Sequence, residues 1–267
     1  MSGTRWLTPA TGYLSGYTHT LNPYTGCSFG CSYCYVRRLP VALFRGEPWG
    51  TWAEPKKGDP KRLQTELRKA KAKGSVTVFF SSATDPYQPL EASVKLSRTL
   101  LEAMADEPPD FVLLQTRSPL VARDIDVLQR LGRHVRVSMT VESDREDVRR
   151  RLTPSAPPFA ARLKALAQLR EAGIATQIAV SPLLPHSPGF AKLLAGTAPR
   201  VIVDDYFRGD GSEGRRSRSL RMPEAYEQAG WSDWYTPEAA DALLRQLQSL
   251  LPEGATGFSV EGFAPPP

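Results

Sequence analysis

Cysteine and histidine are scarce in this sequence of 267 residues, which contains three of each. The three cysteines lie at positions 27, 31 and 34. An odd and tightly clustered set is a poor framework for disulfide bonds, so it excludes the class of small proteins held together by such bonds. Three thiols at this spacing are more typical of a site that binds a metal.

Long apolar runs are also missing. No stretch approaches the roughly 20 apolar residues that a membrane span needs. Residues 1–10 lack the basic start and the apolar run of a signal peptide. The apolar fraction of 41% and the charged fraction of 23% are ordinary for a globular protein, which excludes disordered and fibrous classes. We therefore expect a cytoplasmic protein with no membrane partner.

The net charge is +6, with basic residues concentrated in segments 56–73 and 208–221. Both segments can bind the phosphates of a nucleic acid. The first segment also fits a solvated helix face above Leu63 and Leu67. Three aromatic residues near the C-terminus can stack on bases or pack in the core: Trp231, Trp234 and Tyr235. Charge alone thus leaves a nucleic-acid partner open.

Apolar runs rich in β-branched residues alternate with amphipathic segments through most of the chain. The runs predict strands at 76–81, 111–115, 135–141, 176–180 and 201–204. The amphipathic segments predict helices at 61–73, 89–105, 120–131, 158–172 and 190–195. Another helix should begin at Pro237, whereas 207–222 has no hydrophobic period and reads as a mobile loop. Repeated β-α order predicts a parallel sheet covered by helices, either open and doubly wound or closed into a full or partial barrel.

The cysteines form a compact triplet in a glycine-containing loop, Asn22-Pro-Tyr-Thr-Gly-Cys27-Ser-Phe-Gly-Cys31-Ser-Tyr-Cys34. A four-iron cluster normally has four cysteine ligands, so a cluster bound here has one iron without a protein ligand. A molecule with an amino and a carboxylate group can chelate that iron. The alternative is a structural zinc site completed by His19 or His186. Structural zinc ligands usually come as two separated pairs, so the single triplet favours the cluster.

The spacing Cys27-x-x-x-Cys31-x-Tyr33-Cys34 resembles the signature of the radical S-adenosylmethionine (radical SAM) superfamily. The resemblance implies that Cys27, Cys31 and Cys34 bind three irons of a 4Fe-4S cluster and that S-adenosylmethionine chelates the fourth. Tyr33 then lies beside the adenine. Reductive cleavage of S-adenosylmethionine to a 5'-deoxyadenosyl radical is the implied reaction. It requires an electron donor such as flavodoxin or ferredoxin, because the sequence shows no second cluster or flavin motif.

Wider similarity is to the spore-photoproduct-lyase-like group, also described as DNA repair photolyases. It extends over about 16–185 and includes Asn22-Pro-Tyr-Thr-Gly-Cys27, Ser82-Ala-Thr-Asp-Pro-Tyr-Gln-Pro-Leu-Glu91 and Thr116-Arg-Ser-Pro-Leu120. The group implies a partial (β/α)6 TIM-like barrel with the cluster loop at 22–37. This loop follows the first strand of the barrel, which the resemblance places at 18–23, before the five strands read from the apolar runs. We expect the barrel to occupy 1–205, and 206–267 to form a C-terminal loop and a helical extension packed on it.

The resemblance also implies cofactor-binding residues at the carboxyl ends of the strands. Ser81 and Ser82 stand where the superfamily binds the amino group of S-adenosylmethionine, although a turn or helix cap explains them equally. Arg117 stands near the cofactor carboxylate, unless it forms a surface ion pair. On the fourth strand Ser138 is our candidate for a cofactor contact, with Thr140 and Glu142 as alternatives because the register is not fixed by the sequence.

Five other polar residues lie at or just after the ends of these strands. Asp85 reads as a turn residue before Pro86, and Tyr87 and Gln88 can face the cavity. Asp204 and Asp205 end the last strand, where a solvated carboxylate pair is the more common outcome. No catalytic residue is identified from the sequence.

The sequence favours a radical enzyme that acts on a nucleic acid or nucleotide. The alternatives are a radical enzyme that acts on a small molecule, peptide or protein, and a zinc-stabilised binding module. Repair of spore photoproduct itself is not expected. In that reaction the family uses a cysteine thiol near the end of the second strand, where this chain reads Phe80-Ser81-Ser82; Tyr87 is the candidate substitute. The oligomeric state is not defined by the sequence.

Overall fold

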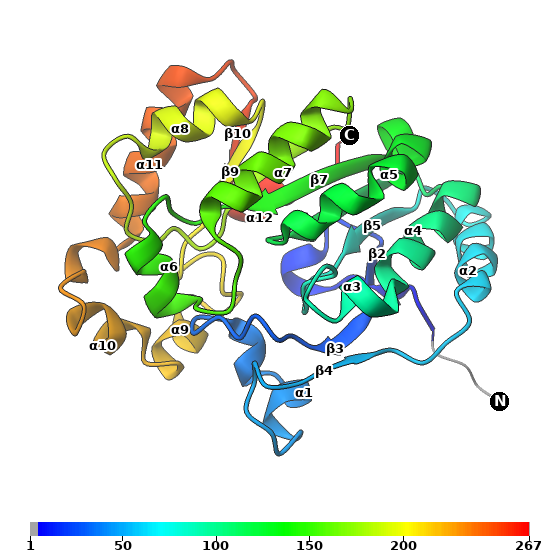
Figure 1. Ribbon diagram of the computed structural model, residues 1–267, viewed down its shortest axis with the longest axis horizontal. Helices are drawn as coiled ribbons and strands as arrows, with labels where there is room; N and C mark the ends of the chain where they lie inside the picture. The colour runs from blue at the N-terminus through cyan, green and yellow to red at the C-terminus, as the bar shows by residue number, and fades with distance from the viewer. Residues whose placement is uncertain (1–4, 267) are drawn as a thin grey trace.

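The computed structural model describes residues 5–266 and is organised around one eight-stranded sheet in the order β1-β2-β5-β6-β7-β8-β9-β10 (Figure 1). All neighbouring strands pair in parallel except β1, which is antiparallel to β2. The bounds are β1 Thr8–Pro9, β2 His19–Leu21, β5 Thr77–Phe80, β6 Phe111–Thr116, β7 Val135–Thr140, β8 Thr176–Val180, β9 Val201–Val203 and β10 Thr256–Phe258. The predicted α/β class with a mostly parallel sheet is confirmed.

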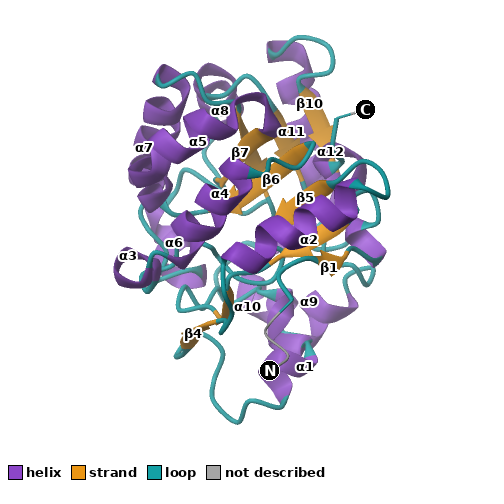
Figure 2. Cartoon of the chain, turned by 90° about the vertical axis from the view of Figure 1, so that its right-hand side faces the viewer, coloured by secondary structure: helices purple, strands orange, loops and turns teal. Residues whose placement is uncertain are grey.

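Helices connect successive parallel strands and cover the outer face of the sheet (Figures 1 and 2). The covering helices are α2 Lys61–Lys71, α3 Glu91–Val94, α4 Leu96–Asp106, α5 Ile125–Leu131, α6 Glu146–Leu152, α7 Phe159–Glu171, α8 Phe190–Thr197 and α11 Pro237–Leu250. Shorter helices are α1 Pro40–Leu43, α9 Arg215–Ser219, α10 Met222–Glu227 and α12 Ser259–Phe263, with 3-10 turns η1 Gly12–Leu14, η2 Tyr35–Arg38, η3 Pro119–Asp124, η4 Gly132–His134 and η5 Ser232–Trp234. The side chains of Leu63 and Leu67 are fully buried beneath α2, so its basic residues form a solvated helix face.

In three segments described below the structure differs from the prediction. The helix expected at 89–105 is broken into α3 and α4, because Lys95 adopts a left-handed backbone conformation between them. The loop expected at 207–222 contains α9, and Asp210 supports it by accepting hydrogen bonds from the backbone N–H groups of Gly214 and Ser217. Segment 256–258 was not expected to be a strand, yet it pairs in parallel with β9.

The inner face of the curved sheet is filled at one end by an apolar cluster. Its members come from four strands, the N-terminal segment and α12: Tyr17, Phe79, Phe111, Leu113, Ala179, Ile202 and Phe263. The hydroxyl of Tyr17 donates to the carbonyl oxygen of Phe263 at 2.6 Å, which ties the two ends of the chain together there. The other end of the inner face, where the parallel strands end, remains open to polar side chains. Within residues 5–266, no helix combines the length and the apolar character that crossing a membrane requires.

Candidate active site

The cysteine loop is held by a small second sheet, in which β3 (Tyr24–Gly26) pairs with β4 (Ala53–Pro55). Two close backbone approaches fix the loop. A Cβ atom on Gly26 would lie 2.3 Å from the ring of Trp52, and one on Gly50 would lie 2.8 Å from the Cα atom of Gly30. Only glycine fits at Gly26 and Gly50, because both also have positive φ angles.

Two side chains brace the same loop from within. Gln88 accepts a hydrogen bond from the backbone N–H of Ser28 at 2.9 Å and donates to the carbonyl oxygen of Gly26 at 3.2 Å. Arg37 donates to the carbonyl oxygens of Gly30 and Cys31 at 2.5 and 2.9 Å. Gln88 is fully buried and does not line the cavity, so the suggestion that it faces the cavity is wrong.

All three cysteines line one cavity from this loop, and Cys27 and Cys31 are buried. Burial raises the pKa of the Cys27 thiol to about 12 and that of the Cys34 thiol to about 11. It also raises the pKa of Cys31, although the positive charge of Arg117 opposes the shift. Thiolate ligands at these positions therefore require a positively charged group to offset the cost of burying their charge.

The two histidines proposed to complete a zinc site lie elsewhere. His186 packs against the rings of Phe190 and Trp234, and His19 contacts the hydroxyl of Thr18. Across residues 5–266, no three His, Cys, Asp or Glu side chains are grouped around a position for a single metal ion. The donor set instead suits a multi-iron cluster, whose ligands stand farther apart around a larger group.

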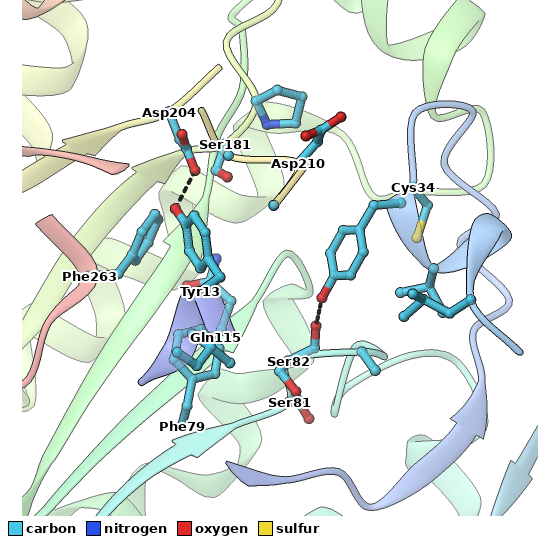
Figure 3. A pocket seen from close by; sticks show the side chains of 18 of the residues that line it. Tyr13, Cys34, Phe79, Ser81, Ser82, Gln115, Ser181, Asp204, Asp210 and Phe263 are labelled. Atoms are coloured by element: carbon cyan, nitrogen blue, oxygen red, sulfur yellow. Dashed lines mark hydrogen bonds between the residues drawn. The ribbon is translucent and has the colours of Figure 1, made fainter. Parts of the chain in front are cut away.

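The cavity has a volume of about 640 Å³, within the usual size range of small-molecule sites, and lies at the carboxyl ends of the parallel strands. Figure 3 shows Cys34 on one side and Asp204 with Tyr13 on the other. Besides the cysteines, the predicted residues Tyr33, Ser81, Ser82 and Arg117 line it. Ser138 does not line it: its hydroxyl is fully buried deeper in β7, where it accepts a hydrogen bond from Gln177. Thr140, two residues farther along the same strand, does line the cavity.

Three buried polar atoms of the cavity wall have no hydrogen-bond partner among the described residues: Ser81 Oγ, Thr84 Oγ1 and Gln115 Oε1. Ser81 also has a φ of +74°, a strained conformation for a residue with a side chain. Unpaired buried polar atoms and backbone strain are costly and concentrate at binding sites. The cavity wall is therefore arranged to hydrogen-bond a ligand.

Ser82 is positioned by the cysteine loop. Asn22 donates a hydrogen bond to the hydroxyl of Ser82 at 3.1 Å and accepts one from the backbone N–H of Ala83 at 2.8 Å. The hydroxyl of Tyr35 donates to the carbonyl oxygen of Ser82 at 2.5 Å, an interaction drawn in Figure 3. The loop before the first cysteine and the turn after the last cysteine thus both fix the end of β5.

A buried charge network joins the cysteine loop to the neighbouring strands. Arg117 donates through one nitrogen to the thiol of Cys31 at 3.0 Å, the hydroxyl of Tyr33 at 3.0 Å and the carboxylate of Glu142 at 2.7 Å. Glu142 also accepts from Tyr33 at 2.6 Å and from Arg162 at 2.6 Å. The predicted pair Tyr33 and Arg117 is therefore brought together.

Glu142 and Arg162 are both fully buried. Burial disfavours the charged carboxylate, but the charges of Arg117 and Arg162 outweigh this effect and hold the pKa of Glu142 below its usual value. The sequence analysis missed Arg162, because an arginine in an amphipathic helix normally faces solvent. The sequence does contain a signal for Arg162, because this charged residue interrupts the row of apolar residues on the buried face of α7.

Asp204 and Asp205 were expected as a solvated pair, and this expectation is wrong: both are buried and line the cavity. The segment after β9 folds back over them, and a Cβ on Gly209 would lie 2.2 Å from the carboxylate of Asp204. Asp205 forms an ion pair with Arg208 at 2.5 Å. Asp204 instead accepts hydrogen bonds from the hydroxyl of Tyr13 at 2.7 Å and from the backbone N–H of Asp205 at 2.9 Å.

Burial raises the pKa of Asp204 from 3.8 to about 6, because it disfavours the charged form. The folded chain thus binds this proton more tightly than the unfolded chain. The stability that this tighter proton binding gives the fold is present below pH 3.8. It is lost as the pH rises from 3.8 to about 6, the two pKa values of Asp204 in the unfolded and folded chain. Above this interval the ionised carboxylate costs the fold up to about 3 kcal/mol.

Two residues near the end of β5 have structural roles. Asp85 accepts hydrogen bonds from the backbone N–H of Tyr87, the hydroxyl of Thr116 and the backbone N–H of Arg117. This agrees with the predicted turn. Tyr87 is fully buried and its hydroxyl donates to Asp124 at 3.0 Å, so the suggestion that it faces the cavity is wrong.

Four arginines lie on α9 or against its end, and we call them the arginine rim: Arg38, Arg215, Arg216 and Arg218. Arg216 lines the cavity, and Arg38 reaches the carbonyl oxygen of Ser219 at the end of α9. Within the described part of the chain, none of the four forms an ion pair with a carboxylate. Trp231, Trp234 and Tyr235 pack in an aromatic cluster around Tyr226 and His186, so core packing accounts for them.

Comparison with protein families gives one match: residues 21–188 match the model of the radical SAM superfamily. A protein of Methanocaldococcus jannaschii is 28% identical over 186 residues, which cover 70% of this chain and 68% of that protein. A protein of Mycobacterium tuberculosis is 30% identical over 174 residues, covering 64% of this chain and 51% of that protein. A protein of Pseudomonas phage M6 named radical SAM Nalpha-GlyT isomerase is 30% identical over 166 residues, covering 61% of this chain and 32% of its own length. The aligned part thus spans about half of the mycobacterial relative and a third of the phage relative.

Solved structures share the fold. A spore photoproduct lyase variant superposes with a TM-score of 0.67 at 13% identity, covering 96% of this chain and 79% of that chain. SuiB of Streptococcus suis, bound to its precursor peptide SuiA, superposes with a TM-score of 0.56 at 13% identity, covering 90% of this chain and 48% of that chain. These likenesses confirm the predicted partial barrel.

Proposed function

Because this chain belongs to the radical SAM superfamily, and is therefore an enzyme that cleaves S-adenosylmethionine, we propose that Cys27, Cys31 and Cys34 hold a 4Fe-4S cluster for that reaction. The donor set fits the group, since three cysteines, two of them buried, open onto one cavity large enough for a cofactor beside the cluster. Bound there, the cluster and S-adenosylmethionine supply reductive cleavage to a 5'-deoxyadenosyl radical.

The chain's own groups position the cofactor. Ser81 and Thr84 offer buried hydroxyls without partners beside the cysteines, suited to the amino group of S-adenosylmethionine. Arg117 is anchored by one nitrogen to Glu142, and its other guanidinium N–H groups make no hydrogen bond to a described residue. They can pair with a carboxylate. Tyr33 is held by Glu142 at the cavity wall, where its ring can contact the adenine.

The substrate that we propose is a nucleic acid or nucleotide. The observation that carries this proposal is the arginine rim, since Arg216 lines the cavity and the other three arginines lie on α9 beside it or against the end of α9. None of the four has a carboxylate partner among the described residues. Guanidinium groups in such a position bind phosphates through charge-assisted hydrogen bonds. The basic face of α2, in contrast, lies away from the cavity and has its own apolar side buried (Figure 1).

The arginine rim gives a testable prediction. Replacing exposed Arg215 and Arg218 together by Gln should weaken binding of a single-stranded oligonucleotide about tenfold at low salt, because two phosphate contacts are lost. The negative slope of log K against log salt concentration should become shallower by about 1.4, which is about 0.7 for each lost contact. Fluorescence anisotropy of a labelled oligonucleotide at several salt concentrations measures both quantities.

The matched control replaces exposed Arg68 and Lys69 of α2 by Gln, which removes the same charge from a surface away from the cavity. This control should retain most of the affinity and the salt slope. Equal losses in the two double variants would show that binding follows net charge alone, and would contradict a substrate path over the rim.

A peptide or small-molecule substrate is the second candidate. Among the structures that share the fold, a spore photoproduct lyase is complexed with a dinucleoside spore photoproduct and SuiB is bound to a precursor peptide, so the fold is compatible with both classes. Stimulation of 5'-deoxyadenosine formation by a peptide but by no nucleic acid would favour this candidate. A zinc-stabilised binding module has no support in the geometry, since the described residues form no tetrahedral ligand group.

We further propose that the reaction differs from spore photoproduct repair, which needs a donor to return a hydrogen atom to the substrate. Every cysteine of the chain lies in the cluster loop, and Tyr87 is buried against Asp124 outside the cavity. We therefore predict no multiple-turnover formation of thymine product from the spore photoproduct dinucleotide. Chromatographic counting of product per enzyme tests this, and many turnovers per chain would overturn it.

An electron donor is the remaining proposed partner. A flavodoxin or ferredoxin fits the requirement for single electrons, because the sequence shows no second cluster or flavin motif.

A further inference from the structure

The cavity has an acidic end opposite the cysteines, where Asp204 and Tyr13 line it. We call this end the Asp204 subsite and define it as these two residues with Ser259, which lies behind them outside the cavity lining. The three residues come from the end of β9, from η1 and from α12. Tyr13 donates to Asp204 at 2.7 Å, and its hydroxyl lies 3.3 Å from the hydroxyl of Ser259. Figure 3 shows Asp204 and Tyr13 facing the interior of the cavity, across from Cys34.

Asp204 differs from the other carboxylates around the cavity. Asp205 is neutralised by Arg208, and Asp210 accepts three backbone N–H groups that hold α9. Asp204 has an exposed fraction of 2% and no ion pair with any cation of the described chain. Its oxygens accept hydrogen bonds from the hydroxyl of Tyr13 and from the backbone N–H of Asp205, and the hydroxyl of Ser259 also interacts with the carboxylate. A carboxylate has about four acceptor positions, so at least one lone pair remains for a further donor.

Neighbouring residues are arranged around this carboxylate. Gly209 leaves the space that the carboxylate occupies, since a Cβ there would lie within 2.5 Å of three of its atoms. Ser259 is held with a φ of +47°, an unfavourable conformation for a residue with a side chain. Gln115, also on the cavity wall, adds a second acceptor, because its Oε1 atom is buried without a partner while its amide donates to Thr140. The wall opposite the cluster thus presents acceptors in need of donors.

We propose that the Asp204 subsite recognises the substrate, and that Asp204 accepts a hydrogen bond from an uncharged N–H group on the Watson–Crick edge of a nucleobase. This inference rests on the proposed function. An anionic group is disfavoured beside the buried carboxylate. The base therefore enters the cavity while its phosphates remain on the arginine rim outside. Carboxylates are established acceptors for base N–H groups, and enzymes that modify bases read this edge.

The test uses anaerobically reconstituted protein with S-adenosylmethionine bound, and four dinucleoside monophosphates as probes, one for each DNA base. For the dinucleotide that binds most tightly, a counterpart is prepared in which the N–H groups of the Watson–Crick edge are methylated. Equilibrium dialysis should show that the wild type prefers the unmethylated form by about 10- to 100-fold, the effect of one hydrogen bond to a charged acceptor.

In Asp204→Asn the preference should fall to within about threefold, because the amide is uncharged and a weaker acceptor. Gly209→Ala should reduce the preference as well, since the methyl group displaces the carboxylate, and it supplies a second variant in case the first does not fold. Asp233→Asn, an exposed site away from the cavity, removes a carboxylate as a control and should leave the preference unchanged.

Two outcomes overturn the inference, and they differ in what they say about the function. Binding with equal affinity for methylated and unmethylated probes, or an unchanged preference in Asp204→Asn, rejects the Asp204 subsite while leaving a nucleic-acid substrate in place. Failure of the wild type to bind any of the four dinucleotides rejects both proposals together.

Discussion

Alanine at Cys27, Cys31 or Cys34 should abolish cluster binding. Anaerobically reconstituted wild type should contain about four iron atoms per chain and absorb in the visible range, with bleaching by dithionite. Each single variant should lose this absorption and most of the iron, because the three thiols converge on one cavity and the sequence offers no other cysteine to replace one. Formation of 5'-deoxyadenosine should fall to background in each. Iron analysis, absorption spectra and chromatography measure these effects.

The control for this experiment is Ser32→Ala, which changes a residue between the ligands. Its hydroxyl makes no hydrogen bond in the described chain, whereas its backbone N–H donates to the carbonyl oxygen of Leu152 and is unaffected. Far-ultraviolet circular dichroism should show that all four variants remain folded. Wild-type protein that binds stoichiometric zinc with negligible iron after anaerobic isolation would contradict the assignment of the ligands.

Loss of the Glu142 carboxylate should destabilise the fold by about 3–5 kcal/mol, because Glu142→Ala leaves the buried guanidinium of Arg162 without its charge partner. The loss also releases Arg117 and Tyr33 at the cavity wall. The double variant Glu142→Leu with Arg162→Met should recover much of this stability, since both buried charges are then replaced by apolar groups. Chemical denaturation followed by circular dichroism measures the free energy of unfolding.

An exposed ion pair supplies the comparison. Glu47→Ala removes the carboxylate that pairs with Arg45 on the surface, and should cost less than about 1 kcal/mol. A loss of similar size in Glu142→Ala and Glu47→Ala would mean that the buried network contributes little. An equally unstable double variant would mean that Glu142 and Arg162 do not act as a charge pair.

The parallel strands and the cysteine loop were predictable because their signals are local. Runs such as 111–115 and 176–180 are rich in β-branched and apolar residues over the length of one strand, and the structure places strands there. The cysteine spacing is a local pattern as well. Short elements supported by distant contacts gave no such signal: β10 has three residues and exists through its pairing with β9.

Residues whose environment depends on long-range packing were assigned less well. Ser138 and Thr140 lie on the same face of β7, and only the depth of the apolar cluster below the cavity decides which of them reaches it. Asp204 is buried because η1 and α12, from opposite ends of the chain, close over the end of β9. The partners of Glu142 come from three other segments, the cysteine loop, the end of β6 and α7, so a buried carboxylate was not foreseeable from its own segment.

The central claim is that this chain cleaves S-adenosylmethionine at a cluster held by its three cysteines. The most direct measurement is chromatographic detection of 5'-deoxyadenosine and methionine after anaerobic incubation of reconstituted protein with S-adenosylmethionine and dithionite. We predict both products from the wild type, slowly without substrate, and neither above background from the variant with all three cysteines replaced by alanine. Equal amounts of 5'-deoxyadenosine from the cluster-loaded wild type and the triple variant under every reductant would contradict the claim.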